Sequence, residues 1–140
     1  MKSRSIWAVG TGVLVIIVVT TLVDIVLHET GVFPPVGQPI DNSLALLATS
    51  YRMVISVAGA WLTARLSPDE PMKHAMILGY VGVVLGLVGV VATWNLGLGP
   101  RWYPISLAVL AIPQCWVGGR FYDMRKRGRK SGRPDHDRTE

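Results

Sequence analysis

The sequence predicts an all-α membrane protein in which four transmembrane helices form a bundle of two antiparallel hairpins, with both termini on the cytoplasmic side (N-in/C-in). Three observations lead to this fold class: the chain is 50% hydrophobic and 16% charged, it contains four apolar segments of about membrane-spanning length, and Lys and Arg recur in alternate connectors. Mean hydropathy is +0.39. Eight of the fourteen Lys and Arg residues follow Gly119, so the preceding part cannot supply the charged surface of a soluble globule.

The four spans are expected at about residues 6–27, 44–64, 75–94 and 103–118. A bilayer core of roughly 30 Å needs about 20 apolar helical residues, and backbone groups in lipid must be paired within the segment. The first span follows a basic head as a signal peptide would, but its apolar run is too long and no small-residue cleavage site follows it. We therefore expect it to be retained. The fourth span is short and contains Pro113 and Gln114.

Turn residues mark the starts of the second and third spans. Asp41, Asn42 and Ser43 precede the second apolar segment and are all suitable N-caps. Ser67-Pro68-Asp69-Glu70 has the pattern of a capping box with proline at the first helical position. The third helix is therefore expected to start at this tetrapeptide.

The distribution of Lys and Arg predicts the orientation. The head before the first span holds Lys2 and Arg4, and the connector of residues 28–43 holds no Lys or Arg. The connector of residues 65–74 holds two, the one of residues 95–102 holds only Arg101, and the tail holds eight. Because positively charged connectors stay in the cytoplasm, both termini are expected inside.

Residues 1–119 are expected to form the transmembrane domain, and residues 120–140 a basic, disordered cytoplasmic tail. The tail contains eight basic and four acidic residues and few apolar ones, a composition typical of segments that do not fold alone. Directly after a span, such a segment binds anionic lipid headgroups with about 1 kcal/mol per basic residue near the surface.

Small residues recur on one face of the third span. They include Gly79, Gly82, Gly86 and Gly89, at spacings that place them in one line along a helix. In lipid, small residues allow helices to approach closely. We interpret this stripe as a helix-packing surface that meets the second span, to which a short connector joins it. A sliding surface or a ligand groove is the alternative.

Arg52 is the residue in the apolar segments that most needs an explanation. It lies eight residues beyond Leu44, about 12 Å along the helix, and a central arginine costs roughly 2.5 to 3.5 kcal/mol on insertion scales. Asp24 is the acid inside the first predicted span and lies close enough in depth for an arginine to reach it. We therefore predict an intramembrane polar pocket that opens outward, formed by Asp24, His28, Tyr51 and Arg52.

Two interpretations of this pocket stay open. Ionisable residues within membranes often mark functional sites, so the pocket could bind an anion or couple to protons. A structural ion pair that fixes the register of the first two spans, or an arginine that extends to the outer interface, explains the same residues.

The remaining sequence patterns do not indicate catalysis. The chain has no phosphate-binding glycine loop, HExxH pair or nucleophile elbow, and its single cysteine, Cys115, forms neither a disulfide within the chain nor a thiolate cluster. We expect no catalytic residues, no metal site, no cofactor and no enzymatic activity. The basic residues lie beside apolar segments rather than among exposed aromatics, so no nucleic acid is expected as partner.

The segments TSYRMVISVAGAWLTARLSPDEPMKHAMILGYVG (49–82) and GPRWYPISLAVLAIPQCWVGG (99–119) resemble small four-helix membrane proteins of bacteria that usually carry no assigned activity. The resemblance implies a bacterial plasma (inner) membrane and no mechanism. The favoured function is an accessory subunit or oligomeric scaffold, with the lipid bilayer and a second copy or another membrane protein as partners. The alternative is a small transporter or anion-binding permease that uses Asp24 and Arg52.

Overall fold

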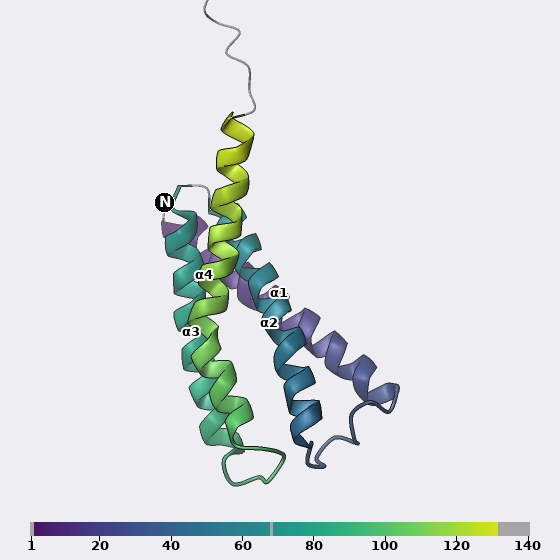
Figure 1. Cartoon of the computed structure of the whole chain (residues 1–140). Helices are drawn as coiled ribbons and strands as arrows, with labels where there is room; N and C mark the ends of the chain where they lie inside the picture. Colours follow the sequence, from purple (N-terminus) through teal and green to yellow (C-terminus); the bar gives the residue numbers. More distant parts are fainter. Residues whose placement is uncertain (1, 68, 132–140) are drawn as a thin grey trace, which may run out of the picture.

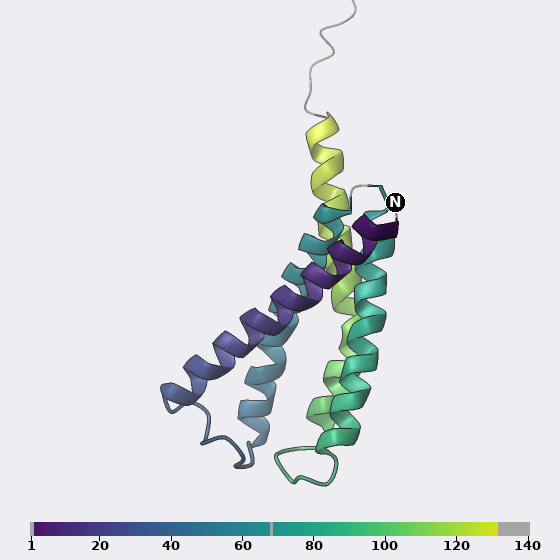
Figure 2. The same ribbon diagram turned by 180° about the vertical axis from the view of Figure 1, so that it is seen from behind.

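The structure, a computed structural model that describes residues 2–67 and 69–131, is all-α and consists of four packed helices (Figure 1). The helices are α1 (Lys2–Glu29), α2 (Asn42–Leu66), α3 (Pro71–Thr93) and α4 (Trp102–Ser131). The chain reverses direction at each connector, so successive helices run in opposite senses (Figures 1 and 2). The start of α1, the α2–α3 connector and the end of α4 lie at one end, here called the tail end. The loops of residues 30–41 and 94–101 lie at the other, the loop end.

Local sequence explains how the helices begin and where the chain turns. Asp41, one of the three predicted N-cap candidates, is the N-cap of α2, and its carboxylate accepts a hydrogen bond of 2.8 Å from the backbone N–H of Leu44. Gly37, in the first loop, has a φ of 92°, a left-handed conformation that glycine adopts without steric cost.

The predicted capping box at residues 67–70 is wrong. Ser67 instead ends α2, with its backbone N–H bonded to the carbonyl of Ala64, and α3 begins at Pro71 after Glu70. Proline lacks an N–H and has a φ suited to the first helical position. Pro71 therefore marks the start of α3.

The extent of α4 also differs from the prediction. The helix continues past the expected end near Gly118 to Ser131, so residues 120–131 are helical where disorder was expected. Arg, Lys and Met, which dominate this segment, favour helix, and basic side chains near a helix C-terminus interact favourably with its dipole. Residues 132–140, the rest of the predicted tail, lie outside the described residues.

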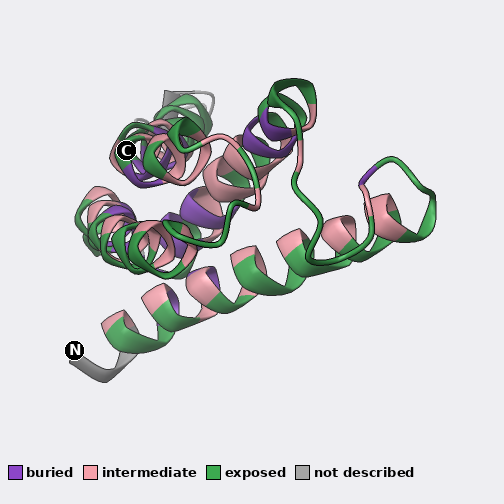
Figure 3. Ribbon diagram, turned by 90° about the horizontal axis from the view of Figure 1, so that it is seen from below, coloured by how far each residue is buried: buried purple, intermediate pink, exposed green. Residues whose placement is uncertain are grey.

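Three of the helices are long and apolar enough to cross a membrane: α1 from Ser5, α2 and α3. Large apolar side chains point outward, for example Trp7 at 77% and Val91 at 79% exposed, whereas fully buried positions such as Ala60 and Ala75 are small. Figure 3 shows the exposed face that α1 presents along its length. An apolar exterior around a small-residue interior is expected where lipid is the solvent. The chain is therefore a multi-pass membrane protein whose helices contact the bilayer.

The glycine stripe of α3 packs on α4, not on α2 as predicted. A Cβ atom added at Gly86 would lie 2.8 Å from Cα of Ala108, and one added at Gly82 would lie 3.1 Å from Cβ of Ala111. Gly79 faces Cys115 in the same way, at 3.2 Å. Gly89 differs from the other three, because a Cβ there would meet no atom within 4 Å.

The second span packs on α4 and α1 through other small residues. A Cβ at Gly118 of α4 would lie 2.5 Å from the carbonyl oxygen of Val57. Gly12 of α1 lies directly against Thr63 of α2. Near the tail end, Leu78 and Cys115 form a core against which Val13 of α1 packs. Toward the loop end, α1 diverges from α3 (Figure 2).

Candidate functional site

An ion pair joins the first two helices. Nη2 of Arg52, on α2, lies 2.5 Å from Oδ2 of Asp24, on α1, and the two side chains are 30% and 28% exposed. The hydroxyl of Tyr51 donates a hydrogen bond to the other carboxylate oxygen of Asp24. The carboxylate thus accepts from two neighbouring residues of α2, which compensates much of the cost of removing both charges from water.

His28, the fourth member of the predicted pocket, lies outside this cluster. One of its ring nitrogens is 2.7 Å from the backbone carbonyl oxygen of Asp24, and its ring contacts that of Phe33 edge to face at 5.5 Å. It is part of the α1 end and the first loop. The structure therefore brings together Asp24, Tyr51 and Arg52, and places His28 one turn nearer the loop end.

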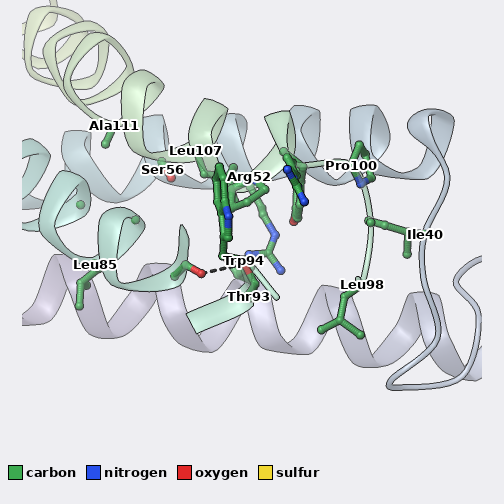
Figure 4. A pocket seen from close by; sticks show the side chains of 18 of the residues that line it. Ile40, Arg52, Ser56, Leu85, Thr93, Trp94, Leu98, Pro100, Leu107 and Ala111 are labelled. Atoms are coloured by element: carbon green, nitrogen blue, oxygen red, sulfur yellow. Dashed lines mark hydrogen bonds between the residues drawn. The ribbon is translucent and has the colours of Figure 1, made fainter. Parts of the chain in front are cut away.

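A cavity of about 780 Å³ adjoins Arg52 (Figure 4). All four helices and both loops contribute to its wall. Arg52 lines it, whereas Asp24, Tyr51 and His28 do not. Figure 4 shows Arg52 among Leu85 and Thr93 of α3, Leu107 of α4 and residues of the two loops. Arg52 therefore connects the ion pair to a space large enough for a small molecule, since ligand pockets measure about 300–1,000 Å³.

Two residues that line the cavity each have a polar atom without a hydrogen-bond partner among the described residues. The atoms are Nε of Arg52, a donor, and Oε1 of Gln114, an acceptor, and both are buried. Gln114 as a whole is 8% exposed. Leaving a buried polar group unpaired costs about 1–3 kcal/mol. Both residues therefore combine an unpaired buried atom with a place in the cavity wall.

The charge of the wall has one sign. Arg52 and Arg101 line the cavity, and the lining residues that the structure describes include no Asp or Glu. The guanidinium of Arg101 stacks over the ring of Trp94, 5.1 Å from its centroid. Asp24 forms an ion pair with Arg52. The two arginines and this acid together therefore leave one net positive charge. A cavity of this kind favours a singly charged anion.

Three of the four stripe glycines also belong to the cavity. Gly82, Gly86 and Gly89 line it, whereas Gly79 lies nearer the tail end and does not. The packing surface and the groove were alternative interpretations of one stripe. In the structure, Gly82 and Gly86 contact α4 at the edge of the cavity, and Gly89 faces open space.

The two loops meet across the loop end of the cavity. The backbone N–H of Ile40 donates to the carbonyl of Leu98 at 2.9 Å. Nε1 of Trp102 donates to Oδ1 of Asn42, also at 2.9 Å. These two bonds tie the α1–α2 hairpin to the α3–α4 hairpin where the helices diverge.

The sequence prediction did not include Gln114 or Tyr103 in the site. Gln114 carried a signal that could have found it, because an amide in an apolar span needs a partner. Tyr103, the second residue of α4, also lines the cavity. No cluster of three His, Cys, Asp or Glu side chains able to hold a metal ion occurs in residues 2–67 and 69–131.

Comparison of the chain with protein-family models, with curated proteins and with solved structures finds no match. The resemblance to small four-helix bacterial membrane proteins therefore stays a prediction.

Proposed function

We propose that the chain crosses a bacterial plasma membrane four times, with α4 as the fourth span and both termini in the cytoplasm. The support is the distribution of charge between the two ends. Arg65, Lys73, Arg120 and the basic end of α4 belong to the tail end, whereas Arg101 is the one Lys or Arg of the two loops at the loop end. Positively charged segments are retained in the cytoplasm, so the tail end faces inward. There the basic part of α4 contacts anionic headgroups.

We further propose that the protein is a non-enzymatic binding protein for a small anionic ligand, which Arg52 holds in the cavity. One observation carries this proposal: Arg52 and Gln114, each with a buried polar atom that has no partner among the described residues, both line a cavity of about 780 Å³ whose wall has two arginines and, within the described residues, no acid. A purely structural ion pair needs no adjoining cavity. A permease must bind the anion before it moves the anion across the membrane, so a transporter would use the same site.

The sequence alone favours an accessory subunit or scaffold. That role predicts a protein whose stability responds to a partner protein and not to small anions. The cavity and the unpaired atoms of Arg52 and Gln114 lie within a single chain. Ligand binding gives these features a role, whereas a scaffold role leaves them without one.

The test is thermal unfolding of the purified protein in neutral detergent, during titration with sodium acetate, inorganic phosphate or sodium chloride. The variant Asp24→Asn/Arg52→Gln removes both charges of the pair. At ten times its Kd, a ligand stabilises the wild type by about 1.4 kcal/mol, and the double variant loses this saturable gain.

The matched control is Glu70→Gln/Lys73→Gln, which removes the exposed ion pair at the tail end, where the two charges lie 3.0 Å apart. It has the same net charge as the double variant and retains the response to anions. Equal responses of the wild type and the Asp24/Arg52 variant to every anion would contradict anion binding in the cavity and favour the scaffold role.

A further inference from the structure

A second, smaller space adjoins the cavity. It measures about 90 Å³, and the lining residues that it shares with the main cavity are Ile16, Ser56, Gly82, Leu85, Ala111 and Gln114. Its remaining lining is almost entirely apolar and includes Val13, Ile17, Leu78 and Val81. We refer to this space as the annex. An occupant of both spaces would contact charged groups at one end and hydrocarbon side chains at the other.

Polarity changes along the cavity in the direction of the helix axes. Arg101, Asn95 and Tyr103 line the part near the loop end, where α3 ends and α4 begins. Leu78 and Val81 of the annex lie about 18–22 Å from the end of α3, at 1.5 Å per residue. A lipid leaflet has the same gradient, from a polar headgroup region to hydrocarbon.

The cavity and the annex both reach the surface of the molecule beside exposed apolar side chains. Leu85 of α3 is 52% exposed and lines both spaces, and Ile17 of α1 is 51% exposed and lines the annex. These residues belong to the two helices that diverge toward the loop end (Figure 2). A hydrocarbon chain could therefore pass from the bilayer between α1 and α3 without crossing polar surface.

From these relationships we infer that the ligand is a single-chain anionic amphiphile, with a carboxylate or phosphate headgroup, that enters laterally from the bilayer between α1 and α3. The headgroup occupies the main cavity and accepts from Arg52, with Arg101 nearby. The hydrocarbon chain lies in the annex and in the seam between Ile17 and Leu85. This inference rests on the proposed binding of an anion and adds the chemical class of the ligand.

The probe is palmitate with a photoreactive diazirine near the end of its chain, added to the protein in nanodiscs of zwitterionic lipid. Irradiation is expected to label α1 and α3 peptides that contain Ile17 and Leu85, as identified by mass spectrometry. Excess laurate should prevent labelling, because it offers both charge and chain. Excess dodecanol, which enters the same bilayer without a charge, should not.

Leu85→Trp fills the shared wall of the cavity and annex and is expected to lower this labelling at least about fivefold, the change that roughly 1 kcal/mol of lost binding produces. Val84→Trp is the matched control, because Val84 is 60% exposed on the same helix and lines neither space. If Leu85→Trp does not fold, Ile17→Trp tests the seam from α1, with gel filtration to verify the fold of each variant.

The outcomes separate the two proposals. Saturable stabilisation by acetate or phosphate without chain-dependent labelling would leave anion binding in place and overturn the amphiphile. Labelling that dodecanol suppresses as well as laurate, or that is equal in Leu85→Trp and Val84→Trp, would also overturn it. A dimer in detergent that Leu85→Trp dissociates, together with no labelling of the seam, would assign the seam to a second copy of the chain.

Discussion

Arg52 donates to Asp24 across 2.5 Å while its own Nε remains buried and without a partner among the described residues, so one guanidinium belongs both to a helix–helix contact and to the wall of a cavity. The pair fixes the register of α1 and α2 and holds Arg52 in place. The cavity gives the same side chain a second surface, which is where we propose that the anion binds. The structural and functional interpretations of the pair are therefore compatible.

The first prediction concerns the balance of charge in this pair. Asp24→Asn is expected to lower the free energy of unfolding by about 1–3 kcal/mol, less than the 3–5 kcal/mol of a fully buried pair because both side chains are about 30% exposed. Asp24→Asn/Arg52→Gln should recover part of this loss, since no charge is then left alone. Denaturation in detergent measures both.

Glu29→Gln serves as the control for this comparison, because Glu29 is an exposed carboxylate at the end of the same helix. Surface substitutions usually change stability by less than about 0.5 kcal/mol. A double variant less stable than Asp24→Asn would show that Arg52 stabilises the fold without its partner.

The second prediction uses two glycines of the same stripe, one packed and one open. Gly86→Ala should destabilise the protein by about 1–3 kcal/mol, because the new methyl group would lie 2.8 Å from the backbone of Ala108. Gly89→Ala should leave the stability unchanged or raise it. The Cβ atom added at Gly89 would meet no atom of a neighbouring helix within 4 Å, and alanine is more favourable than glycine in a helix by about 1 kcal/mol. Thermal unfolding of the two variants side by side measures the contrast. Equal loss in both would mean that the stripe does not pack on α4 as described.

The stripe also illustrates what the sequence could and could not predict. A period of three and four residues identifies a helix face, and Gly79, Gly82 and Gly86 do lie in a packed face. The period contains no information on which neighbour that face meets. Chain proximity suggested α2, whereas Ala108, Ala111 and Cys115 give α4 an equally narrow surface that fits the stripe.

The cavity could not be predicted because a void between helices has no pattern of its own. It depends on the divergence of α1 from α3 toward the loop end, a relationship between segments far apart in sequence. The Asp24–Arg52 contact was predictable, because two opposite charges at similar depth in adjacent apolar segments have few other partners. The helical extension of α4 to Ser131 was not expected, because the high net charge of this segment indicates disorder whereas its Arg, Lys and Met residues favour helix.

The third prediction concerns topology and the fourth span. Cys115 is 3% exposed, so a membrane-impermeant maleimide should react mainly with introduced cysteines. Val36→Cys, at a position 90% exposed in the first loop, should be labelled in intact cells. Met124→Cys, at a position 53% exposed near the end of α4, should be labelled only after permeabilisation. Labelling of both in intact cells would mean that α4 does not cross the membrane, and the reverse pattern would invert the proposed orientation.

The fourth prediction concerns the unpaired amide of Gln114. Leucine has a similar volume and no polar atoms, so Gln114→Leu should raise the free energy of unfolding of the ligand-free protein by about 1–3 kcal/mol. The same change at Gln38, which lines the loop end of the cavity but is exposed in the first loop, should alter the stability of the ligand-free protein by less than about 0.5 kcal/mol. Thermal unfolding without added anions provides the measurement.

The sign of the Gln114→Leu effect decides how the residue is interpreted. A stabilised variant that binds its ligand less tightly would mean that the chain retains a destabilising amide where a ligand contacts it, a common feature of binding sites. A destabilised variant would instead mean that Oε1 has a partner in the ligand-free protein. The case for the cavity would then depend on Arg52 alone.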